Sequence, residues 1–181
     1  MPDFVEGSPL LEGAYRMACE AHEGPRNKDG TGIEHPVEVA RILAEHGFDE
    51  KVVAAALLHD VIEDTETSPE EIEERFGSEV AQLVREMTED ESIEPYEARK
   101  AEHRRRVTRD HRVAAIYAAD KIANARKFQG SAEEIPDEKL EHYIQTFRVL
   151  CETHPELPFL SELRRELEEL AEERARKTES G

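Results

Sequence analysis

The sequence predicts an all-α fold, a bundle of about eight to ten helices. Apolar residues recur at steps of three and four along nearly every segment, which is the period of an amphipathic helix. The alternation of β-branched residues that is typical of strands is missing. Ser8-Pro9 and Ser68-Pro69 have the pattern of a helix N-terminus, while Gly77 and Gly130 follow periodic stretches where a helix is expected to end.

The expected helices share a periodic apolar face and cover residues 9 to about 22, 36–45, 49 to about 64, 69–76, 78–88, about 94–108, 112–129, about 137–152 and about 160–176. Between the first two, the stretch EGPRNKDGTGIE concentrates Gly, Pro, Asn and Asp and predicts a loop. The middle of the helix over 112–129 is unusually apolar, so this helix is expected in the core.

The domain organisation follows from length and from the absence of a linker. A chain of 181 residues without a Gly/Ser/Pro-rich divider has the size of one domain and can bury a real core. We expect a single domain over 1–181, with a core of about 8–153, a C-terminal helix of about 160–176 and a frayed tail. The sequence leaves the oligomeric state open.

The net charge of −19 predicts a surface dominated by Glu and Asp. Such a surface repels polyanions, so broad binding to nucleic acid is not expected. A small phosphorylated ligand remains compatible with a local basic pocket. The chain has no apolar run near the roughly 18 residues of a membrane span, and its first residues lack the features of a signal peptide, so no membrane partner is expected.

Cys19 and Cys151 lie within apolar helical patterns, which predicts buried thiols of a reducing compartment. Together with the absence of a signal peptide, this pattern predicts a cytoplasmic protein. The six histidines in or beside charged segments are expected to be solvated surface groups without a role: His22, His46, His103, His111, His142 and His154.

One constellation indicates chemistry. His59 and Asp60 end the apolar run at 52–58, and burying such groups without partners would cost several kcal/mol. A divalent metal satisfies both. His35 stands at the start of one expected helix and Asp120 lies inside the apolar one. Two His and two Asp offer mixed nitrogen and oxygen ligands that suit Mn²⁺, Fe²⁺, Co²⁺ or Zn²⁺, with positions left for water.

Further polar residues share the helix faces of these candidate ligands. Glu63 and Asp64 come three to five residues after His59 and Asp60, so they are expected on the same face, within reach of a metal-bound water. One carboxylate can take the proton of that water and the other can protonate the leaving group. Asn124, four residues after Asp120, is placed to hold a substrate hydroxyl or a ligand carboxylate.

Each residue also has a purely structural alternative. His35 can cap the helix that starts beside it, and Asp120 can simply pair with Lys121. Glu63 and Asp64 can terminate their helix, although the helix dipole disfavours carboxylates at a C-terminus. The metal interpretation rests on the occurrence of all these residues together.

Four stretches match a known family: HPVEVARIL at 35–43, ALLHDVIEDTETSPEEIEERFG at 56–77, VAQLVREMTED at 80–90 and AADKIANAR at 118–126. Over most of residues 14–150 the chain resembles the HD-domain hydrolases of the RelA/SpoT type, especially the single-domain small alarmone hydrolases. The order and spacing of the motifs are far more specific than a lone His-Asp dipeptide.

The resemblance implies an HD-domain helical bundle and a Mn²⁺ enzyme that removes the 3′-pyrophosphate from guanosine tetra- or pentaphosphate. In that scheme the metal ligands are His35, His59, Asp60 and Asp120. Glu63 and Asp64 act in catalysis, and Lys121 and Asn124 contact the substrate. A synthetase domain, and therefore a bifunctional enzyme, is not expected at this length.

The loop before His35 departs from the family pattern RKDGTPYI-x-HP. Here it reads RNKDGTGIEHP, so Arg26 and Lys28 match the basic pair, whereas Asn27 separates them and Gly32 replaces Pro-Tyr. The departure affects the residues that are expected to recognise the base. It therefore leaves open an alternative function, an HD phosphohydrolase that acts on another nucleotide, such as a nucleoside monophosphate or a phosphorylated nicotinamide cofactor.

The segment YEARKAEHRRRV at 96–107 resembles the family's basic helix, whose cations approach phosphates. Arg99 and Lys100 are the candidates there for substrate contact. A catalytically silent binding module would lack at least one ligand or the Glu63-Asp64 pair, and neither is missing.

Overall fold

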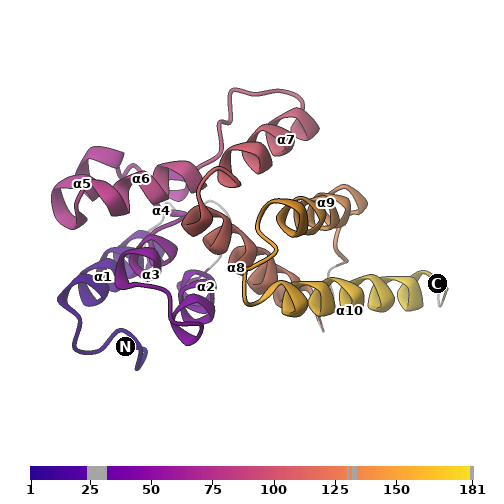
Figure 1. Ribbon diagram of the computed structural model, residues 1–181, viewed down its shortest axis with the longest axis horizontal. Helices are drawn as coiled ribbons and strands as arrows, with labels where there is room; N and C mark the ends of the chain where they lie inside the picture. The colour runs from indigo at the N-terminus through magenta and orange to yellow at the C-terminus, as the bar shows by residue number, and fades with distance from the viewer. Residues whose placement is uncertain (24–31, 130, 132–133, 180–181) are drawn as a thin grey trace.

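The computed structural model describes residues 1–23, 32–129, 131 and 134–179, and within these ranges all regular structure is helical (Figure 1). The prediction of an all-α bundle of about eight to ten helices is confirmed. The helices are α1 Pro9–Glu23, α2 Glu34–Glu45, α3 Glu50–Leu57, α4 Val61–Asp64, α5 Pro69–Phe76, α6 Ser78–Met87, α7 Tyr96–Val107, α8 His111–Phe128, α9 Asp137–Thr153 and α10 Leu160–Glu179.

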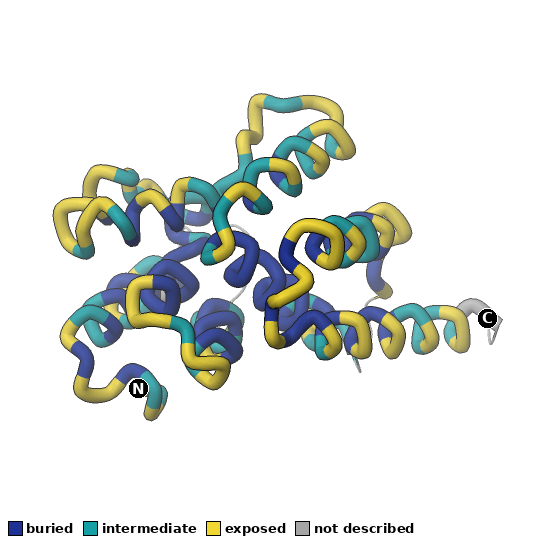
Figure 2. The backbone as a smooth tube through the Cα atoms, in the orientation of Figure 1, coloured by how far each residue is buried: buried dark blue, intermediate teal, exposed yellow. Residues whose placement is uncertain are grey.

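Helix α8 lies at the centre of the bundle. It crosses the middle of the molecule and packs against α2, α3, α6, α7, α9 and α10 (Figure 1). Its backbone is buried over most of its length, whereas the surrounding helices expose their outer faces (Figure 2). Alanines at 114, 115, 118, 119, 123 and 125 are buried along it and allow neighbouring helices to approach closely. The expectation of a core helix over 112–129 is therefore confirmed.

Side-chain caps fix where several helices begin. The Ser68 hydroxyl accepts the backbone N–H of Glu71 at 3.2 Å ahead of Pro69, so the predicted cap signal is present. Asp49 caps α3 through Lys51 and Val52 in the same way. At the other end of the chain, α10 runs on to Glu179, past the predicted helix end at 176.

The segment predicted as one helix over 49–64 is broken in the structure. Helix α3 ends at Leu57, and α4 begins only at Val61. Across the break, Val61 N–H donates to Leu58 O at 3.0 Å, an i to i−3 bond that tightens the chain. The His59 ring also binds the end of α3, because its Nδ1 lies 2.7 Å from Ala56 O, a carbonyl to which the His59 backbone N–H makes only a long bond of 3.5 Å. A periodicity argument does not detect such a break, because apolar residues continue on both sides of it.

The expectation that six histidines are solvated is wrong for four of them. His22, His103, His142 and His154 are buried. In α7 the cause is helical phase: His103 and Val107 are four residues apart, and both point into the protein although charged residues surround them in the sequence. The expectation of two buried thiols is also wrong, since Cys19 is half-buried and Cys151 is exposed.

Arg126 holds three helices together, and we predict a measurable contribution to stability. From α8 it donates to Glu38 of α2 at 2.7 Å and to Glu166 of α10 at 3.1 Å, and it also pairs with Glu162. Glu166 is buried, and after Arg126→Met its carboxylate would keep only the Gln129 amide at 3.0 Å and the more distant Arg165 at 3.6 Å. We expect a loss of about 1–3 kcal/mol in urea unfolding.

Arg164→Met is the matched control, because Arg164 pairs with Glu168 in an exposed i, i+4 arrangement. That change is expected to cost less than about 0.5 kcal/mol. Equal effects of the two substitutions would contradict the role given to Arg126.

Among the described residues, no helix is long and apolar enough to cross a bilayer.

Candidate metal centre and catalytic pocket

Four of the predicted site residues converge from three parts of the fold. His35 comes from the first turn of α2, His59 and Asp60 from the break between α3 and α4, and Asp120 from the middle of α8. His35 Nε2 lies 3.0 Å from Asp120 Oδ1 and 3.8 Å from Asp60 Oδ2. One ligand atom each of His35, His59 and Asp120 lies within 4.8 Å of the others. These distances are compatible with a shared cation.

His59 supplies the test of whether a cation fits. Its Nδ1 faces Ala56 O at 2.7 Å and must donate its proton there, which leaves the lone pair on Nε2. Nε2 is buried, has no hydrogen-bond partner among the residues that the structure describes, and lies 3.0 Å from Asp60 Oδ1 and 3.5 Å from Asp120 Oδ1. Burial opposes a charged imidazole, yet the two carboxylates raise the pKa of His59 well above its usual value. A divalent metal would accept the Nε2 lone pair and offset the charge of the two carboxylates. It also suits a donor set of two imidazole nitrogens and two carboxylate oxygens.

Two neighbours on α8 hold Asp120 in place. Lys121 Nζ donates to Oδ2 at 2.7 Å, and Asn124 Nδ2 donates to Oδ1 at 2.8 Å. Burial raises the pKa of Asp120, but the Lys121 charge and the two histidines together outweigh burial and hold the pKa well below the usual range. The sequence left two partners open for Asn124, a substrate hydroxyl and a ligand carboxylate, and in the structure its amide contacts the carboxylate of Asp120. The structural alternative, an Asp120–Lys121 pair, exists beside the histidine contacts and does not replace them.

Lys121 is itself buried and stacked between aromatic rings. Its Nζ lies 4.3 Å from the centroid of Tyr117 and 5.5 Å from that of Tyr143. Lys121 and Asn124 both line the pocket described below, so a substrate contact is compatible with their positions. His35 makes no side-chain cap of α2, whose N-cap is Ile33, and the capping alternative for His35 is therefore wrong.

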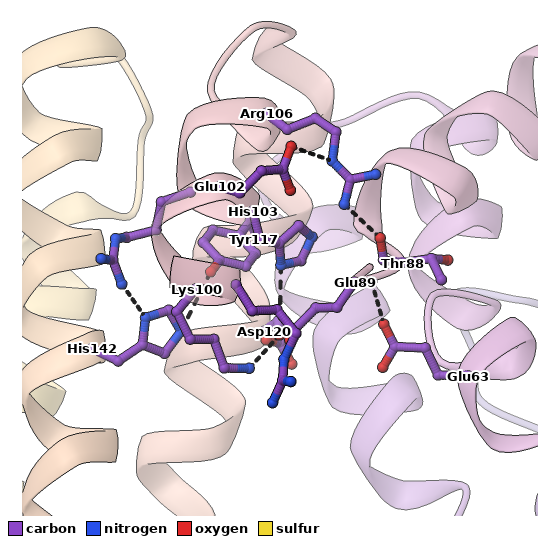
Figure 3. Close-up of polar contacts among 12 residues, drawn as sticks. Glu63, Thr88, Glu89, Lys100, Glu102, His103, Arg106, Tyr117, Asp120 and His142 are labelled. Atoms are coloured by element: carbon purple, nitrogen blue, oxygen red, sulfur yellow. Dashed lines mark hydrogen bonds and ion pairs between the residues drawn. The ribbon is translucent and has the colours of Figure 1, made fainter. Parts of the chain in front are cut away.

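Glu63 lies in α4 beside the candidate metal ligands. Its Oε1 accepts the backbone N–H of Glu89 at 2.6 Å, which fixes the carboxylate in one direction (Figure 3). Burial, assisted by the charges of Asp60 and Glu89, raises the pKa of Glu63 to about 7 against the effect of that hydrogen bond. A carboxylate with such a pKa can exchange protons near neutral pH. Asp64 is buried one residue further and lines the same pocket.

Glu89 links this carboxylate to the basic helix, and the sequence did not reveal it. Its side chain pairs with Lys100, lies 3.3 Å from Arg99 Nε and lies 3.6 Å from His103 Nδ1 (Figure 3). Burial raises the pKa of Glu89, but His103 and Lys100 outweigh it and hold the pKa far below the usual range. Lys100 lines the pocket, whereas Arg99 does not and is turned toward Glu89 and Tyr96.

The site opens into a cavity of about 520 Å³. One part of its lining carries the acidic and imidazole groups, namely His35, Asp60, Glu63, Asp64 and Asp120. Helices α7, α8 and α9 supply a mainly basic and aromatic part that includes Tyr96, Lys100, Lys121, Lys127, Lys139, His142 and Tyr143. A cation site beside lysines is a setting for a phosphorylated ligand.

Lys127 and Lys139 were not singled out from the sequence, although a signal for them exists. Lys127 follows Asp120 by seven residues, which is two helical turns and the same face of α8. Lys139, His142 and Tyr143 stand at steps of three and four on α9. The predicted substrate contacts Arg26 and Lys28 lie outside the described residues.

Comparisons with known proteins agree with this geometry. A family model described as HD domain matches residues 14–151. The zebrafish (Danio rerio) protein named guanosine-3′,5′-bis(diphosphate) 3′-pyrophosphohydrolase MESH1 is 40% identical over 122 residues, which is 65% of this chain and 67% of that protein. The MESH1 protein of Xenopus tropicalis is 35% identical over 142 residues, which is 75% of this chain and 79% of that protein.

Longer relatives and solved structures give the same picture. An Aquifex aeolicus guanosine-3′,5′-bis(diphosphate) 3′-pyrophosphohydrolase is 39% identical over 149 residues, or 77% of this chain, which spans 21% of that relative. The structure reported for a metazoan ortholog of SpoT that hydrolyzes ppGpp superposes with a TM-score of 0.73 at 31% identity, over 92% of this chain and 96% of the other. The chain belongs to the HD-domain family, whose members are metal-dependent phosphohydrolases, and within it resembles the guanosine-3′,5′-bis(diphosphate) 3′-pyrophosphohydrolases.

Proposed function

We propose that the protein is a (p)ppGpp 3′-pyrophosphohydrolase that converts guanosine tetra- and pentaphosphate to GDP and GTP with release of pyrophosphate. The observation that carries this proposal is the partly buried cluster of His35, His59, Asp60 and Asp120 at the edge of a cavity that Glu63 and several lysines also line. The names of the zebrafish, Xenopus and Aquifex relatives support the substrate. The proposed metal is Mn²⁺, held by His35, His59, Asp60 and Asp120.

A divalent ion held by His35, His59, Asp60 and Asp120 would supply Lewis-acid chemistry, namely polarisation of a phosphoryl oxygen and a lower pKa for a water molecule. Glu63 accepts one proton as the water oxygen bonds to the 3′-phosphorus. The bond between that phosphorus and the ribose 3′-oxygen breaks, and Asp64 donates a proton to the leaving oxygen. Lys121, Asn124 and Lys100 hold the substrate, and cations of the cavity offset the charge of the pyrophosphate. Arg26 and Lys28 are proposed to reach the nucleotide.

The remaining proposals concern the whole chain. We propose that it forms one domain, because a single cluster of buried apolar residues extends from Val5 near the start to Leu170 in α10. We also propose a cytoplasmic enzyme without nucleic-acid or membrane partners, since the net charge of −19 repels polyanions.

Product analysis tests the function. The purified protein with Mn²⁺ is offered guanosine tetraphosphate beside a nucleoside monophosphate and a phosphorylated nicotinamide cofactor. We expect pyrophosphate and GDP from the tetraphosphate, loss of turnover after treatment with a chelator, and recovery on adding Mn²⁺. Turnover of another nucleotide with none of the tetraphosphate would overturn the assigned substrate and leave the metal chemistry standing.

A further inference from the structure

A second group of metal-ligand side chains lies outside the HD pocket. His111 is the first residue of α8, and His154 and Glu156 lie in the segment that joins α9 to α10. One ligand atom from each lies within 4.8 Å of the others. Asp120 stands nine positions after His111 on α8, which is about 13.5 Å along the helix axis. None of the three residues lines the catalytic cavity.

We propose that His111, His154 and Glu156 form a second site, for a divalent transition metal of the Zn²⁺ class. Two imidazoles and one carboxylate make a three-ligand set that such ions take, with open positions for water. His111 and Glu156 are exposed, so the open positions face solvent. The site is structural in kind, because none of the described residues that line the catalytic cavity belongs to it.

The hydrogen bonds around His154 prepare it as a ligand. The Thr153 hydroxyl donates to Val149 O at 2.8 Å, so its oxygen is left to accept. His154 Nδ1 lies 2.9 Å from that oxygen and must be the protonated nitrogen. The lone pair is therefore on Nε2. A hydrogen bond from one ring nitrogen that fixes the tautomer is the usual support of a metal-binding histidine.

The other two side chains are also held close together. His111 Nδ1 lies 3.1 Å from Glu156 Oε1, and the rings of His111 and His154 lie 5.9 Å apart between centroids. Phe48 stacks on the His111 ring at 6.0 Å and 22°. Around tetrahedral Zn²⁺, ligand atoms are roughly 3.4 Å apart, so the three side chains need shifts of only about 1 Å to close on an ion.

A plain ion pair between His111 and Glu156 accounts for two of the three residues and gives no role to the Nε2 lone pair of His154. The N-terminus of α8 carries the positive end of the helix dipole and opposes a cation. The carboxylates of Glu156 and of the N-cap residue Asp110 offset that effect. A bound ion would connect the start of the central helix to the α9–α10 junction and would stabilise the folded state by mass action.

Equilibrium dialysis of the full chain against Zn²⁺ alone at neutral pH tests the proposal. Wild type is expected to take up one equivalent more than His154→Gln or His111→Gln. The matched control is His46→Gln, a nearby exposed histidine whose Nδ1 faces Ile42 O, and it is expected to bind as wild type does. Circular dichroism checks that each variant is folded.

A second readout separates this site from the HD cluster. In an Asp120→Asn background, Zn²⁺ is expected to raise the Tm, and adding His154→Gln is expected to abolish the rise. Unchanged Zn²⁺ uptake in both single histidine variants would overturn the proposal. Loss of all uptake in Asp120→Asn would overturn it as well. His111→Gln is expected to leave hydrolysis with Mn²⁺ unchanged.

Discussion

Asp120→Asn is expected to remove the bound divalent metal and to lower hydrolysis by at least about 10³-fold. The carboxylate contacts His35 at 3.0 Å and faces His59 at 3.5 Å, so it is the shared anion of the proposed ligand set. Asparagine keeps the shape but not the charge. Metal content after dialysis, together with kcat for guanosine tetraphosphate, measures the effect.

The choice of Asn over Ala follows from Lys121. This buried lysine pairs with Asp120 at 2.7 Å, and although burial lowers its pKa, Asp120 together with Tyr117 and Tyr143 raises the pKa above its usual value. Removing one partner of a buried pair costs about 3–5 kcal/mol. The asparagine Oδ1 can still accept a hydrogen bond from Lys121, whereas Asp120→Ala would leave the lysine without any partner at this position and would mix unfolding with loss of function. Asp110→Asn, at the N-cap of the same helix, is the matched control and is expected to retain metal and activity. Normal turnover of Asp120→Asn would contradict the proposed metal centre.

Glu63→Gln is expected to retain the metal and to lower kcat by about 10²–10⁴-fold, the usual contribution of a general base. Glutamine can still accept the hydrogen bond from the Glu89 amide, which lies 2.6 Å from Glu63 Oε1, so the fold of this region is expected to persist. Steady-state kinetics with Mn²⁺ measure the change in kcat, and a metal analysis checks that the ion is retained. Glu70→Gln, on an exposed neighbouring helix, is the control.

The pH profile gives an independent check on Glu63. Its pKa is raised to about 7, and only the ionised form accepts a proton, so activity is present above this pKa and is lost as the pH falls through it. A bound cation nearby lowers the pKa, which places the acid limb of the metal-loaded enzyme below about pH 7. The limb is expected to vanish in Glu63→Gln. An unchanged limb would remove Glu63 from the mechanism.

Much of the fold was predictable because helical periodicity and caps are local signals. The caps at Ser68-Pro69 and the apolar course of the central helix are visible in the sequence and are present in the structure. The break between α3 and α4 was not predicted. It is produced by backbone bonds around Leu58 and Val61, and the apolar pattern is the same with or without it.

The candidate site was predictable in its motif residues and not in their surroundings. His35, His59 and Asp120 are brought together as the motifs suggest. Glu89 gave no signal, since its role depends on contacts with Glu63, 26 residues earlier, and with Lys100, 11 residues later. Long-range pairs of this kind are set by how α6 and α7 pack, which local spacing does not encode.

The cavity draws its metal-side groups from α2, the α3–α4 break, α4 and α8, whereas Lys100 comes from α7 and Lys139 from α9. For protein engineering, this division means that selectivity can be redesigned at cavity positions that do not contact the groups around Glu63 and Asp120. A library at Tyr96 and Lys139 would sample different ligands, whereas Lys100 pairs with Glu89 and Tyr143 lies against Lys121, so these two are better kept. Related proteins whose sequences differ in α7 and α9 are therefore the first that should be tested for an altered nucleotide preference.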